Sequence, residues 1–228
     1  MEDWNIFVES VPWFVKSNSK YIVGDKRKGI DFDNEFISKF SFLSKLLSLA
    51  DCTSILIDEA EYELFAWTDI EGYRIGWLCP VASKELTDEI FSDHNLLLNN
   101  FGGIIERFNE PDGTWLLNMN DALTVRESLN DASFIEDYRW SFDDEGVEIP
   151  IALHDFYSIA CEENGNRTLC DRKTGHVLFW APDHSFDHIT VYENCPEFTL
   201  YSIDGVFRFG DWVENIAKQW LSCIAANA

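Results

Sequence analysis

The stretch FYSIACEENGNRTLCDRKTGHVLFW, residues 156–180, decides the fold class. Its first two runs, at 156–163 and 166–171, flank Asn164-Gly165, a dipeptide that suits a two-residue type I′ hairpin turn. A second turn, at 172–175, leads into the last run, HVLFW. We therefore predict a three-stranded antiparallel meander over residues 156–180.

Runs of strand-forming residues elsewhere predict further strands around this meander. SILID, YELFAW and YRIGWL lie within residues 54–78, and a turn at 68–72 joins the second run to the third. GIIERF and TWLLN follow and are joined through Pro111-Asp112-Gly113, a turn sequence. ITVYE and FTLYSI, after the meander, are further candidates.

Four segments instead show the spacing of apolar residues that is typical of helices. Asp33 and Ser83 are candidate N-caps of the first two, and Gly102-Gly103 follows the second. Asp211 and Glu214 form a capping-box-like pair at the start of the last. These predicted helices span residues 33–49, 84–99, 121–129 and 211–224.

Helices and strands interleave without strict βαβ alternation. This order predicts the α+β class, with a largely antiparallel sheet of about six strands flanked by helices. No internal repeat or linker divides the 228 residues. We therefore expect a single domain, 1–228, with a core over 33–228 and residues 1–32 as an N-terminal extension.

Negative charge is the second strong feature of the chain. The formal net charge is −24, and residues 1–45 contribute nothing to it because they hold seven basic and seven acidic residues. A surface of this kind repels nucleic acid and anionic lipid and attracts basic proteins. Plain solubility is the alternative explanation. The basic cluster Lys26-Arg27-Lys28 is interpreted as a solvated loop.

Acidic clusters supply the candidate partner-binding residues, and we expect them to form one broad negative surface. The candidates are Asp58, Glu59 and Glu61 in one strand pair, Asp143, Asp144, Glu145 and Glu148 in a second region, and Glu162 and Glu163 before the hairpin turn.

Motifs for covalent catalysis or phosphate binding are absent: the sequence contains no GxSxG, SxxK, GxxxxGK[ST] or GxGxxG. His184, Asp187 and His188 are the best metal candidates, but Pro182 precedes them and strand-like residues follow, which favours a polar turn. His94 is expected to be a hydrogen-bonded residue on a helix face. We predict that the chain is not an enzyme and holds no cofactor or metal.

Two further patterns bear on location. The N-terminal MEDWNIFVES is acidic where a secretory leader would be basic, and no apolar stretch reaches the ~18 residues of a membrane span. Six cysteines occur without a CxxC pair, as expected of thiols packed in a reducing compartment. We therefore expect a cytoplasmic protein without membrane contact.

Short motifs follow one another in a definite order between residues 97 and 212. They are Leu97-Leu98-Asn99-Asn100-Phe101-Gly102-Gly103, Ile149-Pro150, Tyr157-Ser158-Ile159-Ala160, Glu162-Glu163-Asn164-Gly165-Asn166, Gly175-His176-Val177-Leu178-Phe179-Trp180, Asp183-His184 and Phe209-Gly210-Asp211-Trp212. Their order resembles the SUKH superfamily over about residues 80–225. The chain is longer than the usual SUKH domain, so residues 1–32 and the strands at 54–78 are candidate elaborations.

The resemblance implies function by protein binding, because the superfamily comprises bacterial immunity proteins and fungal regulators of cell-wall synthesis and is not known for catalysis. It suggests an immunity protein that neutralises a cognate toxin. Many such toxins are nucleases, which are basic because they hold phosphates. A regulatory or scaffolding module is the alternative, and a metal-dependent hydrolase built on His184, Asp187 and His188 is the third hypothesis. The oligomeric state stays open.

Overall fold

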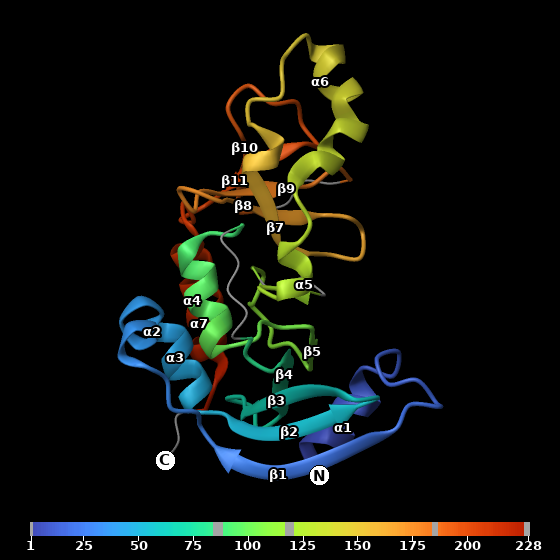
Figure 1. The fold of residues 1–228 in the computed structure, drawn as a ribbon, viewed down its shortest axis with the longest axis vertical. Coiled ribbons are helices and arrows are strands. Elements are labelled where there is room, and N and C mark those ends of the chain that lie inside the picture. Colours follow the sequence, from blue (N-terminus) through green and yellow to red (C-terminus); the bar gives the residue numbers. More distant parts are fainter. Residues whose placement is uncertain (1, 84–88, 117–120, 184–186, 226–228) are drawn as a thin grey trace.

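The computed structural model describes residues 2–83, 89–116, 121–183 and 187–225. It confirms the α+β class, with two antiparallel sheets flanked by helices (Figure 1). The first sheet has the order β1 (Tyr21–Lys28), β2 (Asp51–Ile57), β3 (Ala60–Thr68), β4 (Arg74–Pro80) and β5 (Glu106–Phe108). The second has the order β10 (Ile189–Val191), β11 (Leu200–Ile203), β9 (Val177–Trp180), β8 (Arg167–Asp171), β7 (Phe156–Cys161) and β6 (Asp121–Ala122).

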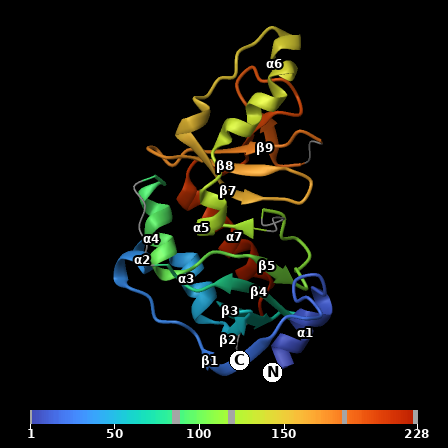
Figure 2. The ribbon, with the colours of Figure 1, turned by 45° about the vertical axis from the view of Figure 1, so that its right-hand side comes forward.

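Helices cover the faces of both sheets. A group of helices, among them α3, α4 and α7, lies between the two sheets, and α6 projects at the far end of the second sheet (Figures 1 and 2). The helices are α1 (Glu2–Ser10), α2 (Asn34–Lys39), α3 (Ser41–Ser48), α4 (Ser92–Asn100), α5 (Val125–Ser128), η1 (Ala132–Tyr138), α6 (Arg139–Glu145), η2 (Leu153–Asp155) and α7 (Phe209–Cys223).

The central strands of each sheet are buried on both faces because apolar residues occupy successive positions in them. In β3, Phe65 and Trp67 join the central core, whereas Leu64 and Ala66 pack with α1 on the opposite face. In β9, Val177 and Phe179 likewise face the central core, and Leu178 and Trp180 face η1 and α6. Alternate side chains of a strand point to opposite faces, so one run of residues serves two cores.

Helix α7 connects the two sheets. At its start the Phe209 amide donates to the Gly175 carbonyl at 2.8 Å, and at its end the Cys223 carbonyl accepts from the Ile70 amide at 2.9 Å. Between these ends Trp220 is fully buried, with its ring centroid 4.9 Å from that of Trp77. The Gly175 turn belongs to the second sheet and Ile70 to the first, so α7 spans the central layer.

The predicted meander is confirmed as β7, β8 and β9, but its first turn differs from the prediction. Gly165 has φ +95°, whereas Asn164 is not among the residues with positive φ, so the turn is not type I′. The Gly165 amide donates to the Glu162 carbonyl, and the Glu162 amide donates to that of Asn166. This pattern fits a three-residue loop closed by a glycine bulge.

The helix predicted over 33–49 is two helices. Asp33 caps α2 as expected, accepting from the Phe36 amide at 2.7 Å, but Phe40 leaves helical geometry at φ −124°. Glu214 does not cap its own helix. Its carboxylate accepts from the amides of Phe42 and Leu43 and so caps α3, while Asp211 accepts from the Arg208 amide at 2.9 Å.

Other helix and strand boundaries also differ from the predicted ones. Residues 84–88, part of the predicted helix 84–99, lie outside the described residues, and α4 starts at Ser92, so Ser83 is not its cap. Residues 114–116 of the predicted strand TWLLN are not a strand, and 117–118 are outside the described residues. The predicted helix 121–129 is shortened to α5, preceded by β6. Residues 133–142, for which no element was predicted, belong to η1 and α6.

The basic cluster Lys26-Arg27-Lys28 is not a solvated loop. It lies in β1, and all three side chains pair with carboxylates, Arg27 with Glu63 and both lysines with Asp51. Arg74 completes a network, donating to Asp3 at 2.7 Å and to Asp51 at 2.9 Å. Burial alone would raise the pKa of Asp51, but hydrogen bonds from Lys28 and Lys26 outweigh it and lower that pKa. Residues 1–32 are thereby tied to the first sheet.

We expect Arg74→Ala to reduce the free energy of unfolding by about 3 kcal/mol, because it leaves the buried Asp3 carboxylate without its main partner. Lys28→Ala is the matched control in the same network. The Lys28 side chain is 78% exposed, so its removal should cost less than about 1 kcal/mol. Urea denaturation of both variants measures the difference, and equal losses would contradict this account of the network.

His94 is a hydrogen-bonded helix residue, as predicted, and it is fully buried. Its Nδ1 lies 3.0 Å from the Tyr157 hydroxyl and its Nε2 lies 2.9 Å from the Leu123 carbonyl oxygen. A carbonyl can only accept, so Nε2 carries the proton and Nδ1 accepts from the tyrosine. Burial lowers the pKa of His94 from 6.5 to about 4 despite the bond to Leu123.

Since the folded-state pKa of His94 lies below its unfolded value, the unfolded chain binds more protons between these two pH values. The contribution of His94 to the free energy of unfolding is therefore fully present above pH 6.5. It falls by about 3 kcal/mol as the pH drops from 6.5 to about 4. Denaturation of wild type and His94→Gln across this range tests it. The variant, which cannot be protonated there, should lose less stability than wild type; parallel pH profiles would contradict the assignment.

Candidate functional site

The candidate acidic residues lie in three places. Asp143, Asp144, Glu145 and Glu148 lie in or directly after α6, at one end of the molecule, and the turn between β2 and β3, with Asp58, Glu59 and Glu61, belongs to the first sheet at the other end (Figure 1). Glu162 and Glu163 lie in the β7–β8 loop of the second sheet. The predicted single broad surface is therefore wrong, because the two sheets hold the clusters apart.

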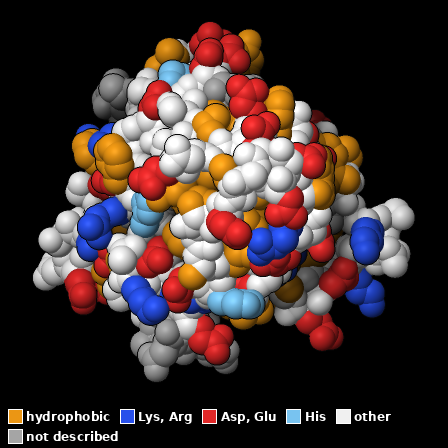
Figure 3. All heavy atoms as spheres, turned by 90° about the horizontal axis from the view of Figure 1, so that it is seen from above, with side chains coloured by type: hydrophobic (Ala, Val, Ile, Leu, Met, Phe, Trp, Pro, Cys, Tyr) orange, Lys and Arg blue, Asp and Glu red, His pale blue; other side chains and the backbone are white. Residues whose placement is uncertain are grey.

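The α6 cluster has one basic neighbour, Arg139, for several carboxylates. Arg139 is held by Glu136 through two bonds of 2.7 and 2.8 Å, with Glu148 at 3.8 Å. Those hydrogen bonds lower the pKa of Glu136. The carboxylates of Asp143, Asp144 and Glu145 make no ion pair within the described residues. Acidic and hydrophobic side chains intermingle over this end of the molecule (Figure 3).

The β2–β3 cluster has a local structural role. Asp58 and Glu59 have φ of +46° and +74°, as a tight turn between antiparallel strands requires. Asp58 accepts from the Lys20 amide at 2.8 Å, and hydrogen bonds from Ser19 and Lys20 lower its pKa. Glu59 and Glu61, the other two members of this cluster, are exposed.

In the β7–β8 loop the two candidates differ. The Glu162 carboxylate accepts from the Asn166 side-chain amide at 2.9 Å, which ties it to the loop. Glu163 is exposed. Glu162 lines a small pocket with Trp115 and Phe179, whereas Glu148 lines a separate pocket with Arg139 and His154.

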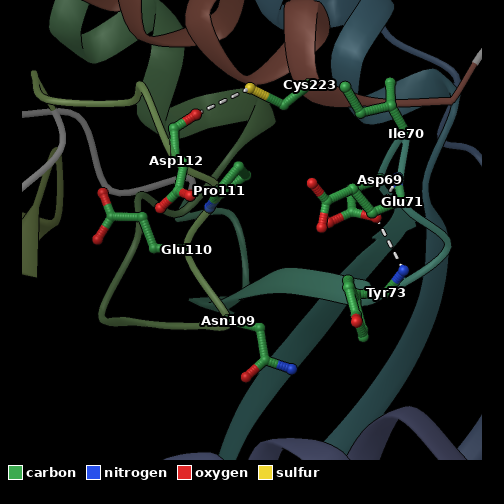
Figure 4. Close-up of a pocket in the computed structure, with 9 residues that line it drawn as sticks. All are labelled: Asp69, Ile70, Glu71, Tyr73, Asn109, Glu110, Pro111, Asp112 and Cys223. Carbon is green, nitrogen blue, oxygen red and sulfur yellow. Dashed lines mark hydrogen bonds between the residues drawn. The ribbon is translucent and has the colours of Figure 1, made fainter.

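An acidic cleft of about 420 Å³ was not foreseen (Figure 4). Asp69 and Glu71, from the β3–β4 turn, form one wall, and Glu110 and Asp112, after β5, form the other. The end of α7 closes it, where the Cys223 thiol lies 3.8 Å from the Asp112 carbonyl oxygen. Both turns could be read from the sequence, but nothing in it showed that they face each other.

Carboxylates give the cleft a negative charge, but no group of three or more of its described residues could hold a metal ion. Asp69 is used by its own turn, accepting from the amides of Glu71 and Tyr73, and Glu110 accepts from Arg107 at 2.7 Å. The carboxylates of Glu71 and Asp112 have no hydrogen bond or ion pair to other described residues. Such a hollow disfavours anions and accommodates cations, which agrees with the sign of the whole chain.

Metal binding finds no support in the part of the chain that the structure describes, where no group of three or more His, Cys, Asp and Glu could hold an ion. His184 lies outside the described residues. His188 adopts φ +73°, and its ring stacks on Trp115 at 4.7 Å. The predicted polar turn is thus seen at Asp187 and His188.

His154 and Asp155 do not form an acid–base pair. Asp155 pairs with Lys173, whereas His154 Nδ1 lies 3.2 Å from both Asp131 and Ser133. A relay needs the serine on one ring nitrogen and the carboxylate on the other. Because both contact the same nitrogen, this trio cannot activate the Ser133 hydroxyl.

Comparison of the chain with models of protein families, with curated proteins and with solved structures finds no match. The SUKH resemblance and the functions that it implies stay predictions. Among the described residues, no helix has the length and apolar character to cross a bilayer.

We expect purified protein to contain no stoichiometric zinc, and His188→Ala to leave its metal content unchanged. The reason is that His188 is stacked on Trp115 rather than grouped with other ligands. Elemental analysis by mass spectrometry after exposure to excess zinc and gel filtration measures this. If wild type binds one equivalent of zinc and the variant binds none, the result would contradict this expectation and support the hydrolase hypothesis.

Proposed function

We propose that this protein is a cytoplasmic binding module for a basic protein partner and has no catalytic activity of its own. The specific form that we favour is a SUKH-type immunity protein that binds a cognate toxin, such as a basic nuclease, and blocks its active site or substrate access.

The observation that carries the proposal is charge without counter-charge around α6. Between residues 131 and 163 the sequence has ten Asp and Glu but one Lys or Arg, Arg139. That arginine is already engaged by Glu136 and Glu148. The remaining carboxylates repel one another, and an approaching cationic surface would relieve that repulsion.

The first sheet supports the same conclusion by contrast. There Lys26, Lys28 and Arg74 form ion pairs with Asp3 and Asp51, so these three cations stabilise the fold.

A negative surface such as that at α6 steers a positively charged partner toward it and raises the association rate, at low salt, toward 10⁸–10⁹ per molar per second. An inhibitor that must capture a toxin quickly gains from such steering.

Affinity purification from nuclease-treated lysate of the source cells tests the proposal. We expect one dominant basic protein, eluted by salt, whose association rate with the purified protein falls at least about tenfold between low and high salt. Several endogenous partners would instead favour the regulatory alternative. A rate constant independent of salt, or recovery of neutral and acidic proteins alone, would contradict the proposal.

A further inference from the structure

A large aromatic side chain stands outside the fold in the middle of the α6 cluster. Trp140 is 62% exposed, while most of the tryptophans of this chain are buried in its cores. Asp143 and Asp144 follow it at positions i+3 and i+4, and Asp137 precedes it by three residues. Residues at i+3 and i+4 of one helix lie on the same face, so Asp143 and Asp144 flank Trp140 on α6. Asp137 is exposed in η1, which ends directly before α6.

The support beneath Trp140 is rigid. Phe142, from the opposite side of the helix, is fully buried in the outer core of the second sheet. Tyr138 packs on the buried Trp180, with ring centroids 5.1 Å apart, and Phe134 packs on the same indole at 5.9 Å. A partner that contacts Trp140 therefore meets a face already ordered, which lowers the entropy cost of association.

The charges of α6 oppose the stability of the helix itself. Its last turn holds Asp143, Asp144 and Glu145 and no basic residue. The carbonyl end of a helix is its negative pole, so carboxylates there are unfavourable and cations are favourable. Arg139 interacts with Asp143 electrostatically but forms its close pair with Glu136, so a positive surface placed against this end of α6 would add the counter-charge that the three residues lack.

We propose that the exposed face of α6, centred on Trp140 and flanked by Asp137, Asp143 and Asp144, is the surface on which the lysine- or arginine-rich face of a protein partner docks. This inference rests on the proposed function and adds the place and the anchor. Cations attract both the carboxylates and the indole face of tryptophan. A second copy of this chain is disfavoured as the occupant, because it would bring the same carboxylates together.

The first experiment uses octalysine as a defined cationic probe. Among the tryptophans, Trp13 is also exposed, at 64%, but its indole N–H donates to Glu106, so it serves as an internal control. In amide and indole NMR spectra, assigned with Trp140→Phe and Trp13→Phe, octalysine should shift the Trp140 indole signal most, and added salt should abolish the shift. Equal shifts at Trp13 and Trp140, or larger ones elsewhere, would overturn the inference.

Matched charge changes provide the second experiment. Asp143→Lys with Asp144→Lys should abolish the octalysine shift at Trp140 and should melt no lower than wild type, because lysines suit the end of α6. Glu61→Lys with Glu71→Lys makes the same change in net charge at exposed positions on the first sheet and should preserve the shift. The reverse pattern would place the docking surface on the first sheet.

The basic partner recovered by affinity purification then separates the two proposals. Trp140→Ala and the Asp143/Asp144 lysine pair should each raise its Kd by about tenfold or more, and the Glu61/Glu71 pair by about twofold at most. A recovered basic partner that binds all variants as tightly as wild type refutes the α6 surface and leaves the proposed function standing. Recovery of no basic partner refutes both.

Discussion

Packing of α7 between the two sheets is the constraint on which the rest of the structure depends. The helix has 15 residues, so it is about 22 Å long and reaches from the β8–β9 turn to the β3–β4 turn. Its tryptophans fill the space between: Trp212 and Trp220 are fully buried, and Trp220 touches both Trp67 and Trp77 of the first sheet. Residues from both sheets thus share one core through a single helix.

Helix α7 also supplies polar side chains as hydrogen-bond acceptors to distant segments, a role that its own sequence does not predict. Glu214 caps α3, and the Gln219 side chain accepts from the amides of Trp115 and Leu116. Its C-terminal end closes the acidic cleft against the β3–β4 turn. Backbone N–H groups outside regular ladders need acceptors, and α7 supplies them to segments far away in the chain.

Charge is divided between the two ends of the molecule in a way that follows from the fold. At the first sheet, Asp3, Lys26, Asp51 and Arg74 come from four different elements and neutralise one another. At the second sheet, α6 carries most of its local carboxylates without cations to match. Carboxylates without ion pairs also line the cleft beside the first sheet, and the α6 face differs from that cleft by the exposed Trp140 beside its acids.

The sequence by itself determined the α+β class, the meander over 156–180, the strands within 54–78 and the hydrogen-bonded role of His94 on its helix, because hydrophobic periodicity and turn residues act over a few neighbours. It also marked Asp143, Asp144, Glu145 and Glu148, but not Trp140 as their exposed neighbour. Only the tertiary structure decided that Lys26 and Lys28 are paired, that the acidic clusters lie apart, and that Asp69 and Asp112 share a cleft. Ion pairs and clefts join residues distant in the chain, and their distances are set by how α7 and the two sheets pack, which no local pattern records.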